Sequence, residues 1–242
     1  FNMTPESILS KISEYTKAIL IPSIMGHSAN LEEIMKIAKE RNLKVIEDAC
    51  QSPLGTSKGK LVGTFGDIGI LSLNKHKHIQ TGEGGIAVTN DKDLAYRMRL
   101  IRNHGETSAD SKSFEDLTNT FGFNYRMGEI EAAIGVQQLK KIESLVESRI
   151  KIVNYMSGKL KNLDRFIDVP YVKADTKHVY YLYAIKYKRK EGMPHRDDVV
   201  KAICAEGVPV RCGFQKPLYL FKMYQDRIAY AGESCAVWGP LY

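Results

Sequence analysis

Four polar residues with the types needed for chemistry follow two apolar stretches of this 242-residue sequence. Asp48 ends the first stretch and Gln51 comes three positions later, whereas Ser72 ends the second stretch and Lys77 follows five positions after it. In open parallel sheets, ligands bind beyond the carboxyl ends of the strands. A carboxylate, an amide, a hydroxyl and an amine that follow such strands are therefore the first candidates for a ligand site.

Each of these residues also has a purely structural interpretation. A carboxylate such as Asp48 at the end of a buried strand is often only a helix cap or a loop anchor. Lys77 lies within the charged run Lys75-His-Lys-His78, which could be a solvated loop. Position alone therefore does not assign a function to either residue.

The flanking sequence predicts the elements that must position these groups. A short helix begins at Thr4-Pro5, where a capping hydroxyl precedes a proline at the first helical position. Apolar periodicity then predicts a strand over 17–21, a helix over 30–42 and a strand over 44–48. This order is a βαβ unit, which implies a parallel sheet covered by helices with a right-handed crossover.

A glycine-punctuated stretch follows, and then a second set of elements. The pattern predicts a strand over 68–73, a tight turn over 82–85 and a strand over 86–89. A helix starting at Asn90-Asp91 is expected to run to about Asn103. Ser72 and Lys77 should therefore stand at the end of a strand and in the loop behind it.

One long amphipathic pattern divides the rest of the chain. It runs from Met127 to Leu160, is expected to break once, and links two domains. We expect a large domain over 1–145, and a linker helix with a smaller α/β domain over 146–242, including a helix over 197–206.

Composition excludes several classes of protein. With 43% hydrophobic and 26% charged residues the chain can bury a core, and no apolar run approaches the roughly 18 residues that a membrane span needs. The four cysteines are scattered and form no CxxC spacing, which argues against a disulfide scaffold or a zinc site and favours a reducing, cytoplasmic setting.

The net charge permits an anionic partner without choosing one. Thirty-five basic and 28 acidic residues give +7. The densest basic stretch, 186–190, is closed by Glu191-Gly192 and is typical of a solvated hairpin tip. We therefore expect neither nucleic acid nor a membrane as partner.

Several separate motifs agree with one known family in order, spacing and residue type. They are Val-Ile-Glu-Asp-Ala-Cys-Gln over 45–51, Gly-Thr-Phe-Gly-Asp over 63–67, the run over 72–85, Arg-Asn-His-Gly over 102–105 and Gly-Phe-Asn-Tyr-Arg-Met over 122–127. Together they resemble the DegT/DnrJ/StrS family of pyridoxal-phosphate-dependent sugar aminotransferases, strongly over residues 1–140 and more loosely beyond. The resemblance implies the fold-type-I architecture, with a large mixed-sheet α/β/α domain and a smaller C-terminal α/β domain.

The resemblance also implies roles for individual residues. Asp48 would face the pyridine nitrogen of the cofactor, Gln51 its ring hydroxyl and Ser72 its phosphate. Asn124, in the Gly-Phe-Asn-Tyr-Arg segment, would reach a cofactor phosphate in the neighbouring subunit, which implies a homodimer.

The matching Schiff-base lysine is Lys77 rather than Lys75, because it lies five residues before Gly-Glu-Gly-Gly. The residue types agree with this chemistry. An imine-forming amine must be neutral, and a buried anion such as Asp48 favours a protonated pyridine, which then accepts electron density. Lys77, once released, would carry the proton between substrate and cofactor.

The activity implied is transfer of an amino group, from glutamate in most relatives, to a nucleotide-linked 4-keto-6-deoxy sugar. The family also contains sugar 3-dehydratases, in which a histidine replaces the lysine. His76 and His78 leave a one-residue misalignment open. The sequence also leaves room for a non-catalytic basic binding module and for a catalytically silent relative.

Relatives begin upstream of the segment that matches Phe1. The resemblance expects a phosphate-binding turn and a ring-stacking aromatic residue there, and further strands after Tyr242. On this basis we expect the sequence to be a piece of an aminotransferase that would aggregate and lose the cofactor when expressed alone.

Overall fold

The computed structural model describes residues 1–106, 121–213 and 216–226, and the chain divides into two compact units, Phe1–Lys186 and Tyr187–Tyr242. The predicted boundary at residue 145 between a large and a small domain stays a prediction. Within the described ranges, no helix is both long and apolar enough to cross a membrane.

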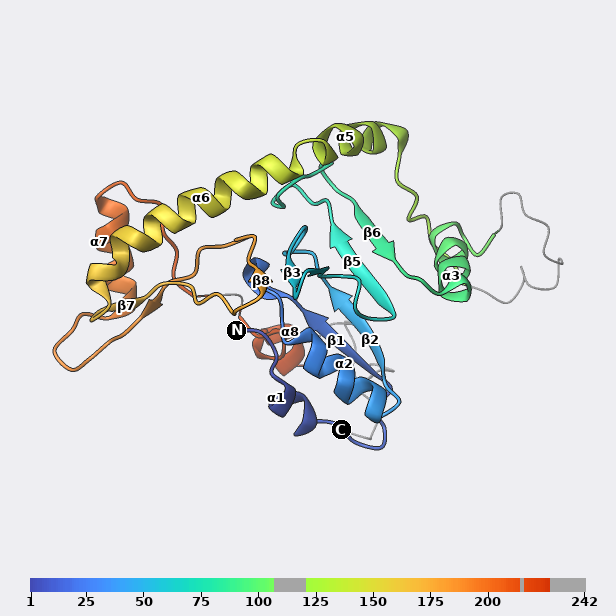
Figure 1. Cartoon of the computed structure of the whole chain (residues 1–242), viewed down its shortest axis with the longest axis horizontal. Coiled ribbons are helices and arrows are strands. Elements are labelled where there is room, and N and C mark those ends of the chain that lie inside the picture. Colours follow the sequence, from blue (N-terminus) through green and yellow to red (C-terminus); the bar gives the residue numbers. More distant parts are fainter. Residues whose placement is uncertain (107–120, 214–215, 227–242) are drawn as a thin grey trace. The chain divides into compact units, whose positions relative to one another are not determined.

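A four-stranded mixed sheet forms the centre of the first unit (Figure 1). Its strands, in spatial order, are β1 (Ala18–Pro22), β2 (Lys44–Asp48), β5 (Ile68–Ser72) and β6 (Gly85–Val88). The βαβ prediction is confirmed, because β1 and β2 are parallel and α2 (Leu31–Glu40) connects them. A fully parallel sheet is not found: β6 runs antiparallel to β5, since the loop between them contains no crossover helix.

The main core lies between this sheet and α2. Helical spacing puts the apolar residues of α2 on one face, where they are buried against alternate residues of β1 and β2. The largest fully buried members are Ile21, Leu31, Ile34 and Val45. This packing fixes the direction of β2 and therefore the position of its last residue, Asp48.

A second buried cluster holds the loop that follows β5. It joins Leu73 and Ile79 of this loop to Ile142 and Val146 of α6 (Ile142–Leu160) and to Val179. The lysine-bearing loop is thus packed from two sides by parts of the chain that lie far from it in sequence.

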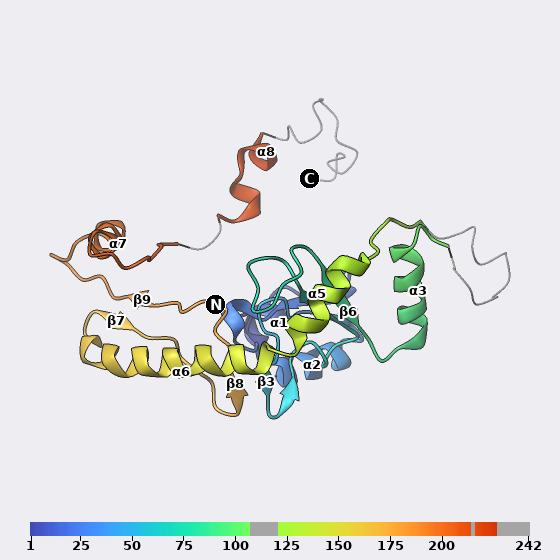
Figure 2. The same cartoon turned by 90° about the horizontal axis from the view of Figure 1, so that it is seen from above.

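The long amphipathic pattern forms two helices, as predicted. They are α5 (Glu129–Leu139) and α6, which are separated by a break at Lys140 and Lys141 (Figure 2). The helix expected near 90–103 is α3 (Lys92–Arg102), whose first turn is capped by the Asp91 carboxylate.

A small antiparallel sheet leads into the segment that starts at His178, and its spatial order is β4 (Lys60–Leu61), β3 (Thr56–Ser57) and β8 (Thr176–Lys177). The remaining elements of the first unit are α1 (Pro5–Leu9), η1 (Ile24–Gly26), η2 (Lys161–Leu163) and β7 (Ile167–Asp168). The boundary between the units falls within β9 (Lys186–Tyr187). The second unit contains α7 (Arg196–Ala205), η3 (Leu218–Leu220) and α8 (Lys222–Gln225). The basic stretch 186–190 is not wholly a hairpin tip, because it begins in β9.

Candidate active site

Asp48 and Ser72 close two neighbouring parallel strands and lie at the same edge of the sheet. Asp48 pairs with Ile70 across the β2–β5 ladder, so Ser72 lies two residues farther along the same direction. The Ala49 N–H donates to the Ile70 carbonyl at 2.9 Å and continues the ladder past the end of β2. The predicted meeting of these two side chains at one edge follows from this register.

The Asp48 carboxylate is half-buried and partly engaged. Its Oδ1 accepts the Cys50 N–H at 3.0 Å, and the Cys50 thiol contacts the same side chain. Burial and the neighbouring Asp48 raise the pKa of the Cys50 thiol to about 12, so the thiol stays neutral. Because a carboxylate offers roughly four lone-pair positions, Asp48 can still accept a hydrogen bond from a ligand N–H.

Gln51 and Ser72 each accept one backbone N–H and keep a side-chain donor. The Gln51 Oε1 accepts the Met25 N–H at 2.6 Å, which leaves the amide NH₂ as the outward end. The Ser72 Oγ accepts the Asn74 N–H at 3.2 Å, and its hydroxyl proton remains available as a donor. An anionic acceptor and two neutral donors therefore stand along one edge, a set that fits a protonated heterocycle carrying a hydroxyl and a phosphate.

The loop after β5 presents Lys77 rather than Lys75. The Lys75 N–H donates to the Gly82 carbonyl at 2.8 Å and the Lys77 N–H to the Asn74 carbonyl at 2.9 Å, so the loop is internally braced. The side chain of Lys75 is exposed, whereas that of Lys77 is half-buried. The positive charge of Lys77 lowers the pKa of the Cys50 thiol, against the larger effects of burial and Asp48, so the lysine charge acts on the turn that follows Asp48.

His78 has a structural partner instead. Its ring is 6% exposed, and Nε2 donates to the Val179 carbonyl at 2.8 Å. Burial lowers the pKa of His78, and Nδ1 has no partner among the described residues, so the ring is neutral with its proton on Nε2. The neighbouring His76 is exposed. His78 is therefore held by a backbone carbonyl, and His76 points to solvent.

The motifs assigned no role to the segment that begins at His178, which contains Tyr180, Tyr181 and Tyr183. The Val179 N–H donates to the Gly26 carbonyl at 2.9 Å, and the Leu182 N–H to the Met25 carbonyl at 3.3 Å. Gly26 has φ +93°, and a Cβ there would lie 2.7 Å from the backbone nitrogen of Tyr181. These contacts bring the Tyr181 ring to 4.8 Å from Lys77 Nζ.

Asn124 is not brought to this edge within the described chain. Its side chain is exposed, and its backbone forms an isolated bridge with Asn103. Its proposed contact with a phosphate of a second subunit stays a prediction.

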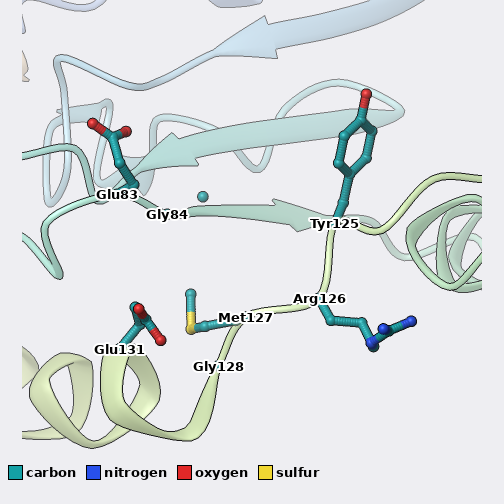
Figure 3. Close-up of a pocket in the computed structure, with 8 residues that line it drawn as sticks. Glu83, Gly84, Tyr125, Arg126, Met127, Gly128 and Glu131 are labelled. Atoms are coloured by element: carbon teal, nitrogen blue, oxygen red, sulfur yellow. The ribbon is translucent and has the colours of Figure 1, made fainter.

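A separate open hollow of about 540 Å³ lies between the start of β6 and the start of α5 (Figure 3). The Met127 side chain points into it toward Gly84, with Glu131 beside it. The other lining residues are Glu83, Gly85, Tyr125, Arg126 and Gly128. It contains none of the side chains that the sequence assigned to the cofactor.

The family model for DegT/DnrJ/EryC1/StrS aminotransferases matches residues 1–238. The chain belongs to this family. The resemblance inferred from the motifs is thereby confirmed, and so is the fold class, because solved members share the mixed α/β architecture.

Three relatives illustrate the similarity. GDP-perosamine synthase of Caulobacter vibrioides is 34% identical over 244 residues, which cover 99% of this chain and 64% of that protein. An aminotransferase structure from Psychrobacter cryohalolentis has a TM-score of 0.84 at 30% identity, and the match covers 96% of this chain and 63% of that one. An Escherichia coli GDP-4-keto-6-deoxy-D-mannose-3-dehydratase structure with bound hydrated PLP has a TM-score of 0.75 at 30% identity, with 86% and 56% covered.

The chain thus spans about three fifths of the length of the curated relatives it matches, since 64%, 61% and 59% of the first three are covered.

Proposed function

We propose that this chain carries the lysine-bearing part of a pyridoxal-phosphate-dependent aminotransferase that moves an amino group from glutamate to the keto carbon of a nucleotide-linked 4-keto-6-deoxy sugar. The observation that carries the proposal is the position of Lys77. It is half-buried, it lies in the loop that follows Ser72, and it belongs to a chain of a sugar aminotransferase family.

The residues at the sheet edge suit the cofactor. Pyridoxal phosphate supplies, when bound, an electron-withdrawing ring that accepts the electron pair left when the amino donor loses its α-proton. Asp48 would accept a hydrogen bond from the protonated ring nitrogen and keep it charged. The outward NH₂ of Gln51 would donate to the ring hydroxyl and the Ser72 hydroxyl to the phosphate. Lys77 would anchor the group and move a proton at its Nζ.

A sugar 3-dehydratase is the second candidate, because such an enzyme is among the relatives. The resemblance expects a histidine at the anchoring position in that case. Two observations favour the aminotransferase: His76 is exposed, and the His78 ring is already bonded to the Val179 carbonyl. A basic binding module has less support still, since the family match covers residues 1–238.

A homodimer is part of the proposal. The segment around Asn124 exposes large apolar side chains beside the open hollow, a surface that a second copy of the chain could cover. The most exposed of them are Phe121, at 94%, and Ile130, at 76%. Light scattering of the whole protein should give a dimer, and a fully active monomer would contradict this part.

A cytoplasmic setting also remains an expectation from the cysteine pattern.

The decisive experiment marks the anchoring lysine in the whole protein. Borohydride reduction in the presence of pyridoxal phosphate, followed by peptide mapping, should attach the cofactor to Lys77. Lys75→Ala should leave the label in place and Lys77→Ala should abolish it. A label on Lys75, or none on either residue, would remove the proposed role of Lys77.

Substrate class needs a second measurement. The whole protein is incubated with glutamate and a panel of GDP-, dTDP- and UDP-linked 4-keto-6-deoxy sugars, and the products are identified by mass. An amino sugar formed together with 2-oxoglutarate supports the aminotransferase. A 3-deoxy product without an incorporated amino group would establish the dehydratase instead.

A further inference from the structure

The aromatic ring of Tyr181 lies against the amine of Lys77. Lys77 Nζ is 4.8 Å from the ring centroid, within the distance at which an ammonium and an aromatic face attract each other. The two residues lie 104 positions apart in the sequence, so the contact joins distant parts of the chain.

Backbone hydrogen bonds on both sides of Tyr181 hold the ring in this place. The Val179 N–H and the Leu182 N–H donate to the carbonyls of Gly26 and Met25, at 2.9 and 3.3 Å. The Met25 N–H in turn donates to the side chain of Gln51 at 2.6 Å, which connects this segment to the turn after Asp48. The ring position is therefore set by the same edge of the sheet that carries the proposed cofactor residues.

His78 ties the lysine to the same segment. It is the residue next to Lys77, and its Nε2 donates to the Val179 carbonyl at 2.8 Å. Its ring also lies against Tyr181, with the ring centroids 6.1 Å apart and the planes at 41°. Lys77 and His78 of the lysine loop thus contact Val179 and Tyr181. The cation–π contact is therefore supported by a hydrogen bond and a ring contact beside it.

An aromatic face stabilises an ammonium more than a neutral amine, because the attraction is between the positive charge and the ring quadrupole. We propose that Tyr181 is a positioning residue for Lys77, whose ring face holds the lysine head at the sheet edge when the amine carries a proton. This inference rests on the proposed role of Lys77 as the proton-carrying lysine. The phenol hydroxyl of Tyr181 has no part in it.

Two substitutions separate the ring from the hydroxyl. Tyr181→Phe keeps the aromatic face and Tyr181→Leu removes it. Tyr183→Leu is the matched control, because Tyr183 lies two positions away, with its hydroxyl 3.0 Å from that of Ser157. All variants are made in the whole protein.

The first readout does not depend on activity. Lysines of the cofactor-free protein are reductively methylated with ¹³C, and the Lys77 signal is assigned by its loss in Lys77→Arg. The ring current of Tyr181 should shift this signal upfield in the native protein, in Tyr181→Phe and in Tyr183→Leu. The shift should disappear in Tyr181→Leu. A native signal without an upfield shift would overturn the proposal, even if Tyr181→Leu proved insoluble.

The second readout is a single turnover with glutamate. The rate constant should fall about two- to thirtyfold in Tyr181→Leu, which is the range expected for one cation–π contact, with little change in the glutamate concentration for half-saturation. Tyr181→Phe should keep most of the native rate. An equal loss in Tyr181→Phe, or an unchanged rate in Tyr181→Leu, would exclude the ring face as the positioning group.

The borohydride experiment separates failure of this inference from failure of the proposed function. A label on Lys77 together with an unchanged rate in Tyr181→Leu would reject only the role of Tyr181. An unlabelled Lys77 would reject the role of the lysine, and the inference would fall with it.

Discussion

Glu47 and Asp48 are adjacent acids in β2, and their carboxylates serve opposite faces of the sheet. Successive side chains of a strand point to opposite sides. Glu47 is 1% exposed and accepts the backbone N–H groups of Gly63, Phe65 and Gly66. Asp48 points to the other side, where it accepts the Cys50 N–H at 3.0 Å. One acid holds a turn, and its neighbour keeps acceptor positions for a ligand.

Glu47→Gln should destabilise the protein without touching the ligand residues. A hydrogen bond to a charged group contributes about 1.5–3 kcal/mol, and the glutamine NH₂ would face one of the three N–H donors. We expect the free energy of unfolding, measured by urea denaturation, to fall by about 3 kcal/mol. Glu40→Gln is the control, because Glu40 is exposed on a helix and its carboxylate lies 3.9 Å from Lys36 Nζ. This substitution should change the free energy of unfolding by less than about 0.5 kcal/mol. Equal effects of the two substitutions would contradict this account.

Asp48→Asn should separate binding from turnover. The amide keeps the shape of the side chain but removes the negative charge that would hold a protonated ring nitrogen. We expect the whole protein to retain pyridoxal phosphate through dialysis while the transamination rate falls about 10²–10³-fold, the loss typical for one preorganised electrostatic partner. A near-normal rate would remove Asp48 from its proposed role.

Gly26→Ala should disturb the segment that carries Tyr181. The new Cβ would stand 2.7 Å from the Tyr181 nitrogen and 2.8 Å from the Tyr180 nitrogen, and the backbone has φ +93°. Strain of this kind costs about 1–3 kcal/mol before the clash is counted, so thermal unfolding should shift down by several degrees. Gly59→Ala is the control, since φ is +78° there but a Cβ would meet no atom within 4 Å. Gly59→Ala should lower the unfolding temperature only by the effect of backbone strain. A decrease as large as that of Gly26→Ala would show that the clash with Tyr181 does not contribute.

Stability should fall as the pH drops from about 6.5 to 4. His178 stacks on His27 and Tyr180, and burial, with a smaller effect of His27, lowers its pKa from 6.5 to about 4. Between these values the unfolded chain binds a proton that the folded chain does not, so stability rises with pH in this window. The loss by pH 4 amounts to about 3 kcal/mol for His178 alone.

His27 and His78 also have lowered pKa values because of burial, and they act in the same direction. His178→Phe keeps an aromatic ring in the stack and removes the titration. Urea denaturation from pH 4 to 7 should therefore show a weaker pH dependence in this variant. A variant curve parallel to the native one would assign the acid sensitivity to other groups.

Much of this site could be predicted because its signals are local. Alternating and helical apolar patterns located β2, β5 and α2, and turn chemistry located the loop after Ser72. The break between α5 and α6 also followed from the length of one pattern. The resemblance to the family motif distinguished Lys77 from Lys75, and this assignment stays a prediction, although Lys77 is half-buried and Lys75 is exposed.

Only the tertiary structure decided which distant residues meet this edge. Three tyrosines crowd the stretch 180–183, and nothing in their spacing shows which one contacts an amine more than a hundred positions earlier. The choice depends on Gly26, whose missing side chain lets the backbone at Tyr181 approach. It depends equally on the hydrogen bond from His78 to Val179, formed across 101 positions. Such contacts arise from packing between separate elements, whereas periodicity and turn preferences report only on residues close together in the chain.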